Sequence, residues 1–194
     1  MKTKMKLLAA MFLGGVMAQG ANAALSSDAA SFGAVDEDFE GFDGLVTQGP
    51  ESIGGGAEWS ASIDSTLGAF AVDLIENGTW GAGNNFAGIG DLFQGGTAFD
   101  GSVTVMFANG AFGAGALFSI YQDIGGTASI TLDALGAGNS ILESHSFVIN
   151  FADPLLENAG TFYGIGRDSA DVLGLRISGD GFVLDDLRIA TSPV

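Results

Sequence analysis

The chain has 194 residues, of which 32 are Gly, 23 are Asp or Glu, six are Lys or Arg and none is Cys, and its formal charge is −17. This charge argues against nucleic-acid binding, which depends on clustered Lys and Arg. The absence of Cys excludes disulfides, thiolate zinc sites and cysteine nucleophiles. With 47% hydrophobic residues, the chain is expected to fold as one globular domain with its own core.

The first 23 residues have the pattern of a secretion signal. Three lysines lie within the first six residues, the apolar run 7–16 follows, and Ala21-Asn22-Ala23 has the form of a cleavage site. The apolar run is shorter than the roughly 20 residues that span a bilayer, and no second long run follows. We therefore expect an exported protein, extracellular or periplasmic, that is cleaved after Ala23 and has no transmembrane segment.

Cleavage would make the protein more acidic. All lysines of the chain lie in the signal, so 194 less 23 leaves 171 residues in which 23 acids face only Arg167, Arg176 and Arg188, a formal charge of −20. Such a surface repels anionic polymers and anionic lipid, and it favours divalent cations. Because an exported chain without Cys has no disulfides, we expect its stability to come from its core, from bound ions or from assembly.

After a lead segment, 24–34, the sequence predicts an all-β domain over residues 35–190 and a short tail, 191–194. Apolar residues alternate with small or polar ones in short runs, and Gly, Asn and Asp clusters separate the runs. The runs are 57–63, 67–75, 102–107, 114–121, 128–132, 144–151, 161–165, 172–177 and 182–189. Their number favours a two-sheet antiparallel β-sandwich of jelly-roll type, and Asn109-Gly110 predicts a tight hairpin after the run 102–107.

Catalytic candidates are few. His145 is the only histidine, and it would lie on the same face of its strand as Phe147 and Ile149, which is typical of a structural histidine. The sequence has no Gly-x-Ser-x-Gly motif that would supply a nucleophilic serine. In the acidic run 36–40, Asp36, Asp38 and Glu40 would share one face of a strand. This run loosely resembles the E-x-D-x-E strand of laminarinase-like β-glucanases, and that resemblance implies a carboxylate-dependent glycoside hydrolase. The alternatives are that the three carboxylates form a solvated strand edge or a cation site.

The acidic residues of the last run point more strongly to cation binding. Val183, Asp185 and Leu187 share one parity, so Asp185 is predicted on the more apolar face, whereas Asp186 and Arg188 can pair on the other. A buried carboxylate must be paired, hydrogen-bonded or metal-bound. Calcium binds oxygen ligands of this kind, so Asp185 is a candidate calcium ligand. The alternative, to which we give equal weight, is that Asp185 accepts hydrogen bonds from backbone amides at the end of the strand.

Two tryptophans are candidate glycan platforms. Trp80 lies in turn-like sequence and Trp59 in the run 57–63. Either indole could stack on a sugar ring, or it could anchor the core or a loop.

The order of the runs 128–136, 147–149, 161–165, 172–177 and 182–189 resembles secreted bacterial β-sandwich domains that often precede a PEP-CTERM sorting signal. The sorting signal itself is not found in residues 191–194. These domains are also similar to jelly-roll carbohydrate-binding modules, and that resemblance implies a structural calcium held by Glu40 and Asp185, with Asp38 and Asp186 as further ligands.

The hypothesis that follows from the sequence is a secreted, non-catalytic, calcium-stabilised protein of the extracellular matrix or cell surface. Its expected partner is an extracellular polysaccharide or a second copy of itself. A carbohydrate-binding module that uses Trp80 or Trp59 is the first alternative, and the glycoside hydrolase is the second.

Overall fold

The computed structural model describes residues 23–70, 74, 78–81, 85–92, 100–121, 127–150, 157–158 and 160–194. The predicted signal up to residue 22 lies outside the described residues, as do the ends of the predicted runs 67–75 and 144–151. In chain order the elements are β1 (Ala23–Ser26), the 3-10 turn η1 (Ala29–Phe32), β2 (Leu45–Thr47), β3 (Glu51–Ile53), η2 (Gly54–Gly56), β4 (Ala57–Ala61), β5 (Ser65–Phe70), β6 (Thr79–Trp80), β7 (Asn85–Ile89), β8 (Asp100–Ala111), β9 (Gly113–Ile120), β10 (Thr127–Leu135), η4 (Ala137–Asn139), β11 (Ile141–Asn150), β12 (Glu157–Asn158), β13 (Thr161–Arg167), β14 (Val172–Asp180) and β15 (Phe182–Ala190).

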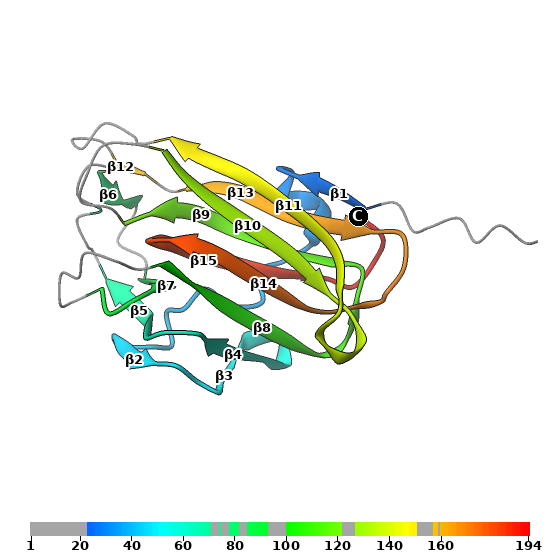
Figure 1. Ribbon diagram of the computed structural model, residues 1–194, viewed down its shortest axis with the longest axis horizontal. Helices are drawn as coiled ribbons and strands as arrows, with labels where there is room; N and C mark the ends of the chain where they lie inside the picture. Colours follow the sequence, from blue (N-terminus) through cyan, green and yellow to red (C-terminus); the bar gives the residue numbers. More distant parts are fainter. Residues whose placement is uncertain are drawn as a thin grey trace, which may run out of the picture.

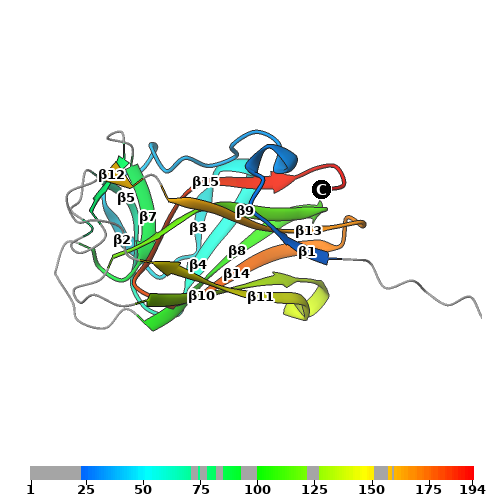
Figure 2. The same ribbon diagram turned by 90° about the horizontal axis from the view of Figure 1, so that it is seen from above.

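The described strands form two antiparallel sheets packed face to face, apart from β6 and β12, which pair with each other in parallel (Figure 1). One sheet has the order β1-β13-β9-β15-β7-β5-β2, and the other has the order β11-β10-β14-β8-β4-β3. Figure 2 shows β9, β13 and β1 of one layer above β14, β10 and β11 of the other. From β8 to β15 the chain passes from one layer to the other between successive sheet strands, apart from the hairpin of β10 and β11 and the short β12, which lies in neither sheet. The predicted jelly-roll-like β-sandwich is therefore confirmed.

The core lies between the sheets because each strand turns its alternate apolar residues inward. The largest of these side chains are fully buried, and they include Trp59, Phe39, Phe86, Phe118 and Phe182. All nine predicted runs coincide with a strand, β4, β5, β8 to β11 and β13 to β15. The strands β1, β2, β3, β6, β7 and β12 were not predicted. Five of them have four residues or fewer, and β7 is buried at four successive positions, so its residues do not alternate.

The predicted hairpin at Asn109-Gly110 is wrong. Both residues belong to β8, which pairs with β4 and β14, whereas β9 lies in the opposite sheet between β13 and β15. A two-residue hairpin needs positive φ at the turn, and neither residue has it. Gly110 is required for a different reason, since a Cβ there would collide with the carbonyl oxygen of Ala170.

The segment 24–34, which the sequence analysis set apart as a lead, is part of the sandwich. β1 forms the edge of the seven-stranded sheet by pairing with β13. From η1, Phe32 then lies on the outer face of that sheet against Phe162, with ring centroids 5.2 Å apart. Gly115 of β9 and Gly164 of β13 are paired in register and leave room for these two rings.

Gly164→Ala is therefore expected to destabilise the protein by about 1–3 kcal/mol, because its Cβ would lie 2.7 Å from the ring of Phe32 and force that ring off the sheet. Urea unfolding measures the loss. Gly41→Ala is the control, because no atom lies within 4 Å of a Cβ at that position. Equal stability of the two variants would contradict the close packing of η1.

Candidate functional site at the β15 bulge

The last strand bulges at its centre. Asp185 pairs with Leu117 and Arg188 pairs with Gly115, so two residues of β15 stand opposite one residue of β9. Asp186 provides the bend with a φ of 51°, in the left-handed region that Asp tolerates better than most residues. Because of the extra residue, Asp185 and Arg188 face the same side of the sheet, the outer side on which η1 lies.

The parity prediction for this strand is therefore wrong beyond the bulge. It placed Asp185 with Leu187 and Ile189 on one face and Arg188 on the other, but the register shift reverses the alternation after Asp186. The predicted burial of Asp185 nevertheless holds, since its side chain is only 3% exposed.

Asp185 is a buried carboxylate in a polar setting. Its Oδ1 accepts a hydrogen bond of 2.7 Å from the backbone N–H of Asp186, and the side chain of Trp80 donates another hydrogen bond to the carboxylate. Burial raises the pKa of Asp185 to about 7, and the nearby negative charges of Asp186 and Asp38 contribute to the same shift. The protein thus carries a carboxylate that changes its charge near neutral pH.

Of the four residues implied as calcium ligands, three lie close enough to interact. Asp38 and Asp186 both act electrostatically on Asp185. Glu40 is turned toward β7, where its Oε1 accepts a 2.7 Å hydrogen bond from the N–H of Asn85. Within the described residues, no group of three or more His, Asp or Glu side chains is arranged to hold a metal ion.

The predicted carboxylate face of Asp36, Asp38 and Glu40 does not form. Phe39 between them has a φ of 57°, and its ring is fully buried edge-on against Trp59, with centroids 5.8 Å apart. The chain turns here instead of extending, so alternate residues do not share one side. Asp38 accepts a 3.2 Å hydrogen bond from the N–H of Glu40, as is common for Asp in a turn.

The other two acids of this run connect distant parts of the backbone. Asp36 Oδ2 accepts a 2.7 Å hydrogen bond from the N–H of Ile189. Glu37 accepts hydrogen bonds from the N–H of Phe39 at 2.6 Å and from the N–H of Gly54 at 2.5 Å. Their carboxylates act as acceptors for backbone amides, which is the alternative to metal binding that the sequence also allows for Asp185.

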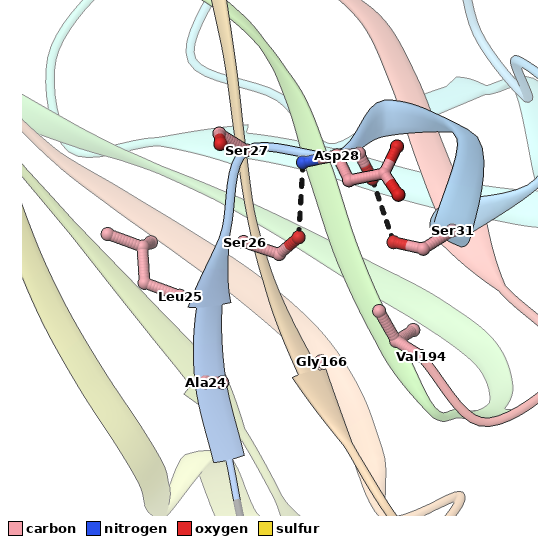
Figure 3. A pocket seen from close by; sticks show the side chains of 8 residues that line it. All are labelled: Ala24, Leu25, Ser26, Ser27, Asp28, Ser31, Gly166 and Val194. Carbon is pink, nitrogen blue, oxygen red and sulfur yellow. Dashed lines mark hydrogen bonds between the residues drawn. The ribbon is translucent and has the colours of Figure 1, made fainter.

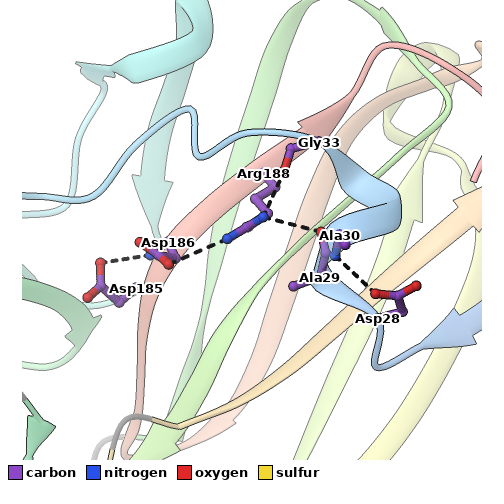
Figure 4. Close-up of polar contacts among 7 residues, drawn as sticks. All are labelled: Asp28, Ala29, Ala30, Gly33, Asp185, Asp186 and Arg188. Carbon is purple, nitrogen blue, oxygen red and sulfur yellow. Dashed lines mark hydrogen bonds and ion pairs between the residues drawn. The ribbon is translucent and has the colours of Figure 1, made fainter.

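Arg188 holds the N-terminal segment against the sheet (Figure 4). Its Nη1 donates to the carbonyl oxygens of Gly33 at 2.7 Å and Ala29 at 3.3 Å, and its Nη2 lies 3.7 Å from the carboxylate of Asp186. At the other end of η1, Asp28 accepts a 3.1 Å hydrogen bond from the N–H of Ala30. The pairing of Arg188 with Asp186 was predicted from the sequence. The contacts of Arg188 to the carbonyl groups of Ala29 and Gly33 were not, because these residues lie more than 150 positions away in the sequence and no local pattern connects them.

Neither tryptophan offers an exposed ring face. Trp59 is fully buried, and its indole N–H donates a 2.9 Å hydrogen bond to Ser65. Trp80 is 5% exposed and packs against Phe86, with centroids 5.2 Å apart. Their placement is that of core anchors, so these two residues give the glycan-platform interpretation no support.

His145 lies on β11, half-buried, with its Nε2 3.3 Å from Oε1 of Glu143. The neighbouring Ser146 faces the opposite side of the sheet, where its hydroxyl shares a 2.8 Å hydrogen bond with Thr131. Since adjacent residues of a strand point to opposite faces, His145 cannot activate its flanking serines. This geometry agrees with the structural interpretation of the histidine.

A surface depression of about 510 Å³ lies beside β1 (Figure 3). Its polar groups bond to one another: Ser26 accepts from the N–H of Asp28 at 3.1 Å, and Ser31 donates to the carbonyl of Asp28 at 2.8 Å. It is lined by Ala24, Leu25, Ser26, Ser27, Asp28, Ser31, Gly166 and Val194. Asp28 is the only titratable side chain in this lining, and it already caps η1.

No protein-family model and no curated protein matches this chain. Among the residues that the structure describes, no helix has the length and apolarity needed to cross a membrane.

The raised pKa of Asp185 predicts a specific pH dependence. Because the folded state binds this proton more tightly than the unfolded chain, the contribution of Asp185 to the free energy of unfolding falls as pH rises from about 4 to about 7. Relative to wild type, Asp185→Asn should therefore gain stability across this range, by up to about 1.4 kcal/mol per pH unit. Chemical unfolding in EDTA at several pH values measures the difference, and a difference that does not vary with pH would contradict the raised pKa. Asp43→Asn, at an exposed position, is the control substitution for this comparison.

Arg188→Lys is expected to destabilise the protein by about 1–3 kcal/mol, because an ammonium group cannot reach both carbonyl groups and Asp186 with the geometry of a guanidinium. Hydrogen exchange should show faster exchange in residues 29–33, while the strands of the six-stranded sheet keep their protection. Unchanged exchange in η1 would show that Arg188 does not hold this segment.

Proposed function

We propose that this protein is a secreted, non-catalytic β-sandwich of the extracellular matrix or cell surface, and that calcium stabilises the junction between its N-terminal segment and β15. The observation that carries the proposal is the buried carboxylate of Asp185 next to the charges of Asp186 and Asp38. Two like charges beside a buried carboxylate are unfavourable, and a divalent cation would remove this repulsion.

The non-catalytic part of the proposal is supported by the engagement of the candidate catalytic groups. Asp36, Asp38 and Glu40 each accept a backbone N–H and do not share a face. A retaining or inverting glycosidase needs two free carboxylates that face each other across a cleft. His145 is held beside Glu143, away from its neighbouring serines.

The calcium part is supported by the chemistry of the junction. Calcium takes six to eight oxygen ligands and accepts backbone carbonyls and water beside carboxylates. Because these carboxylates are not already arranged around one point, calcium would draw Asp38 and Asp186 toward Asp185 and complete its shell with water, which corresponds to the extracellular class of sites with a dissociation constant of roughly 0.1–1 mM. Arg188 pairs with Asp186, and a chain with so few cationic side chains has little else to neutralise Asp38 and Asp185.

A thermal melt tests the calcium site. At 10 mM CaCl₂ and pH 8, the melting temperature should rise by about 3–10 °C above that in EDTA, because ligand binding stabilises the folded state by roughly 1.4–2.7 kcal/mol at these affinities. NaCl of matched ionic strength controls for screening of the net negative charge, and MgCl₂ controls for a non-specific divalent effect.

Asp185→Asn should lose most of this calcium increment, and the exposed Asp43→Asn should keep it. The increment is the quantity to compare, since Asp185→Asn also changes the stability in EDTA. An equal increment in both variants, or no rise beyond that in MgCl₂, would rule out a calcium site at Asp185.

A further inference from the structure

The start of the described chain forms an arm on the seven-stranded sheet, drawn in blue in Figure 1. We define the arm as residues 24–32, which include most of β1 and all of η1. In the described structure β1 pairs only with β13. At the other end of the arm, Phe32 is 2% exposed and packs on Phe162, and the carbonyl oxygen of Ala29 accepts a 3.3 Å hydrogen bond from Arg188. The arm thus has one acceptor site, made of the edge of β13, the ring of Phe162 and the guanidinium group of Arg188.

A short exposed hinge, residues 33–35, joins the arm to the rest of the sandwich. Gly33 has a φ of 90° and a ψ of −151°, a combination that is essentially restricted to glycine. Val35, at the other end of the hinge, is 38% exposed. The N–H of the next residue, Asp36, donates a 2.8 Å hydrogen bond to the carbonyl of Leu187. The arm therefore reaches its own acceptor site only through a sharp turn that one glycine permits.

The contacts of the arm do not depend on which copy of the chain supplies it. The pairing with β13, the packing of Phe32 and the hydrogen bond from Arg188 would be the same for the arm of a second copy. Exchange would also remove the turn at Gly33, because a hinge that crosses to a neighbour can extend. Short hinges under strain favour exchange between chains for this reason. No loop has to be threaded, since the arm is the first segment after the predicted cleavage.

We propose that two copies of this protein exchange their arms, so that each arm occupies the acceptor site of the other copy. From Phe32 to Asp36 an extended hinge spans at most about 14 Å, so the two hinges must lie close to each other. Both arms can then exchange at once, which closes a two-fold dimer. The two hinges run side by side in this dimer, which covers the exposed side chain of Val35. This association goes beyond the proposed function, and the residues proposed to hold calcium lie outside the arm.

Sedimentation velocity of the purified protein from Ala24 onward, in EDTA, tests the proposal. After incubation at about 200 μM, we expect a monomer and a dimer that interconvert slowly, because an arm must leave its acceptor site before it can exchange. The dimer fraction should rise between about 0.05 and 0.5 M NaCl, since salt screens the repulsion between two acidic copies. A monomer under all these conditions, or a dimer that dissociates within seconds of dilution, would overturn the proposal. Because the measurements are made in EDTA, their result does not depend on the calcium site.

Gly33→Val changes the hinge without adding a clash. No atom lies within 4 Å of a Cβ at this position, so the substitution acts through the backbone: valine disfavours a positive φ and favours an extended chain. It should raise the association constant of the dimer at least about tenfold. Gly138→Val is the matched control, because Gly138 in η4 has a φ of 65° and equally open surroundings, and it should leave the association constant unchanged. An equal effect of both variants, or no effect of Gly33→Val, would contradict exchange at this hinge.

A cross-link shows which copy supplies the arm. The chain has no Cys, so Ser31→Cys in the arm and Val194→Cys outside it introduce the only two thiols. Both residues line the depression beside β1, where a short bismaleimide can join them (Figure 3). On a denaturing gel the separated dimer should run as a covalent dimer and the separated monomer as a monomer, while mass spectrometry confirms that the link has formed. A linked dimer that runs as a monomer would refute the exchange, because its arms would still lie on their own copies. Melting temperatures check that each variant is folded.

Discussion

The start of the chain and its last strand depend on one set of backbone hydrogen bonds at the β15 bulge. β7 pairs with β15 only at residues 183–184, and beyond that point the N-terminal segment takes its place. Leu187 accepts a 2.8 Å hydrogen bond from the N–H of Asp36 and donates one of 2.9 Å to the carbonyl of Glu37. These bonds bring Asp38 close to Asp185 and bring η1 under Arg188. The candidate site is therefore a consequence of how the sheet is completed, because its residues meet only where the two ends of the chain meet.

The acidic composition determines how the carboxylates are used. After the predicted cleavage, three arginines face 23 acids, so most carboxylates cannot find a cationic partner. At the junction, Asp36, Glu37, Glu40 and Asp185 each accept a backbone N–H instead. Such bonds satisfy an anion without a counter-charge, since an amide dipole stabilises negative charge in a shielded place. The three arginines each have a defined contact: Arg176 bonds to the buried Asp133 at 2.6 Å, Arg167 bonds to Asp171 at 2.8 Å, and Arg188 bonds to the carbonyl groups of Ala29 and Gly33.

Much of the sandwich could be predicted from the sequence, because a strand with one buried face carries its alternation in the residues themselves, whereas β7, buried at four successive positions, does not. The same alternation misplaced Asp185 relative to Arg188, since a bulge changes the register without changing any local pattern. The acidic run 36–40 was misjudged for a related reason: Phe39 adopts a left-handed φ so that its ring can reach Trp59, and that requirement comes from tertiary packing. Asn109-Gly110 has the residues of a hairpin, but both lie within β8, where Gly110 passes close to the carbonyl of Ala170, a tertiary contact that no local pattern shows.

The missing lysines also bear on the edges of the sheets. Lysine is the residue that commonly protects an exposed edge, since its long side chain carries charge across the open backbone without disturbing the strand. With no lysine after the predicted signal, this chain can protect an edge by keeping it short, as in β1 to β3, or by placing an acid on it. On β11 the single acid, Glu143, is turned toward His145 and is flanked by apolar and hydroxyl side chains. A bulge at Leu142 is the second device on this strand, because the extra residue interrupts the regular spacing of its open backbone groups. Without lysine, the protection of each edge therefore depends on strand length and backbone geometry as well as on the few acids placed there.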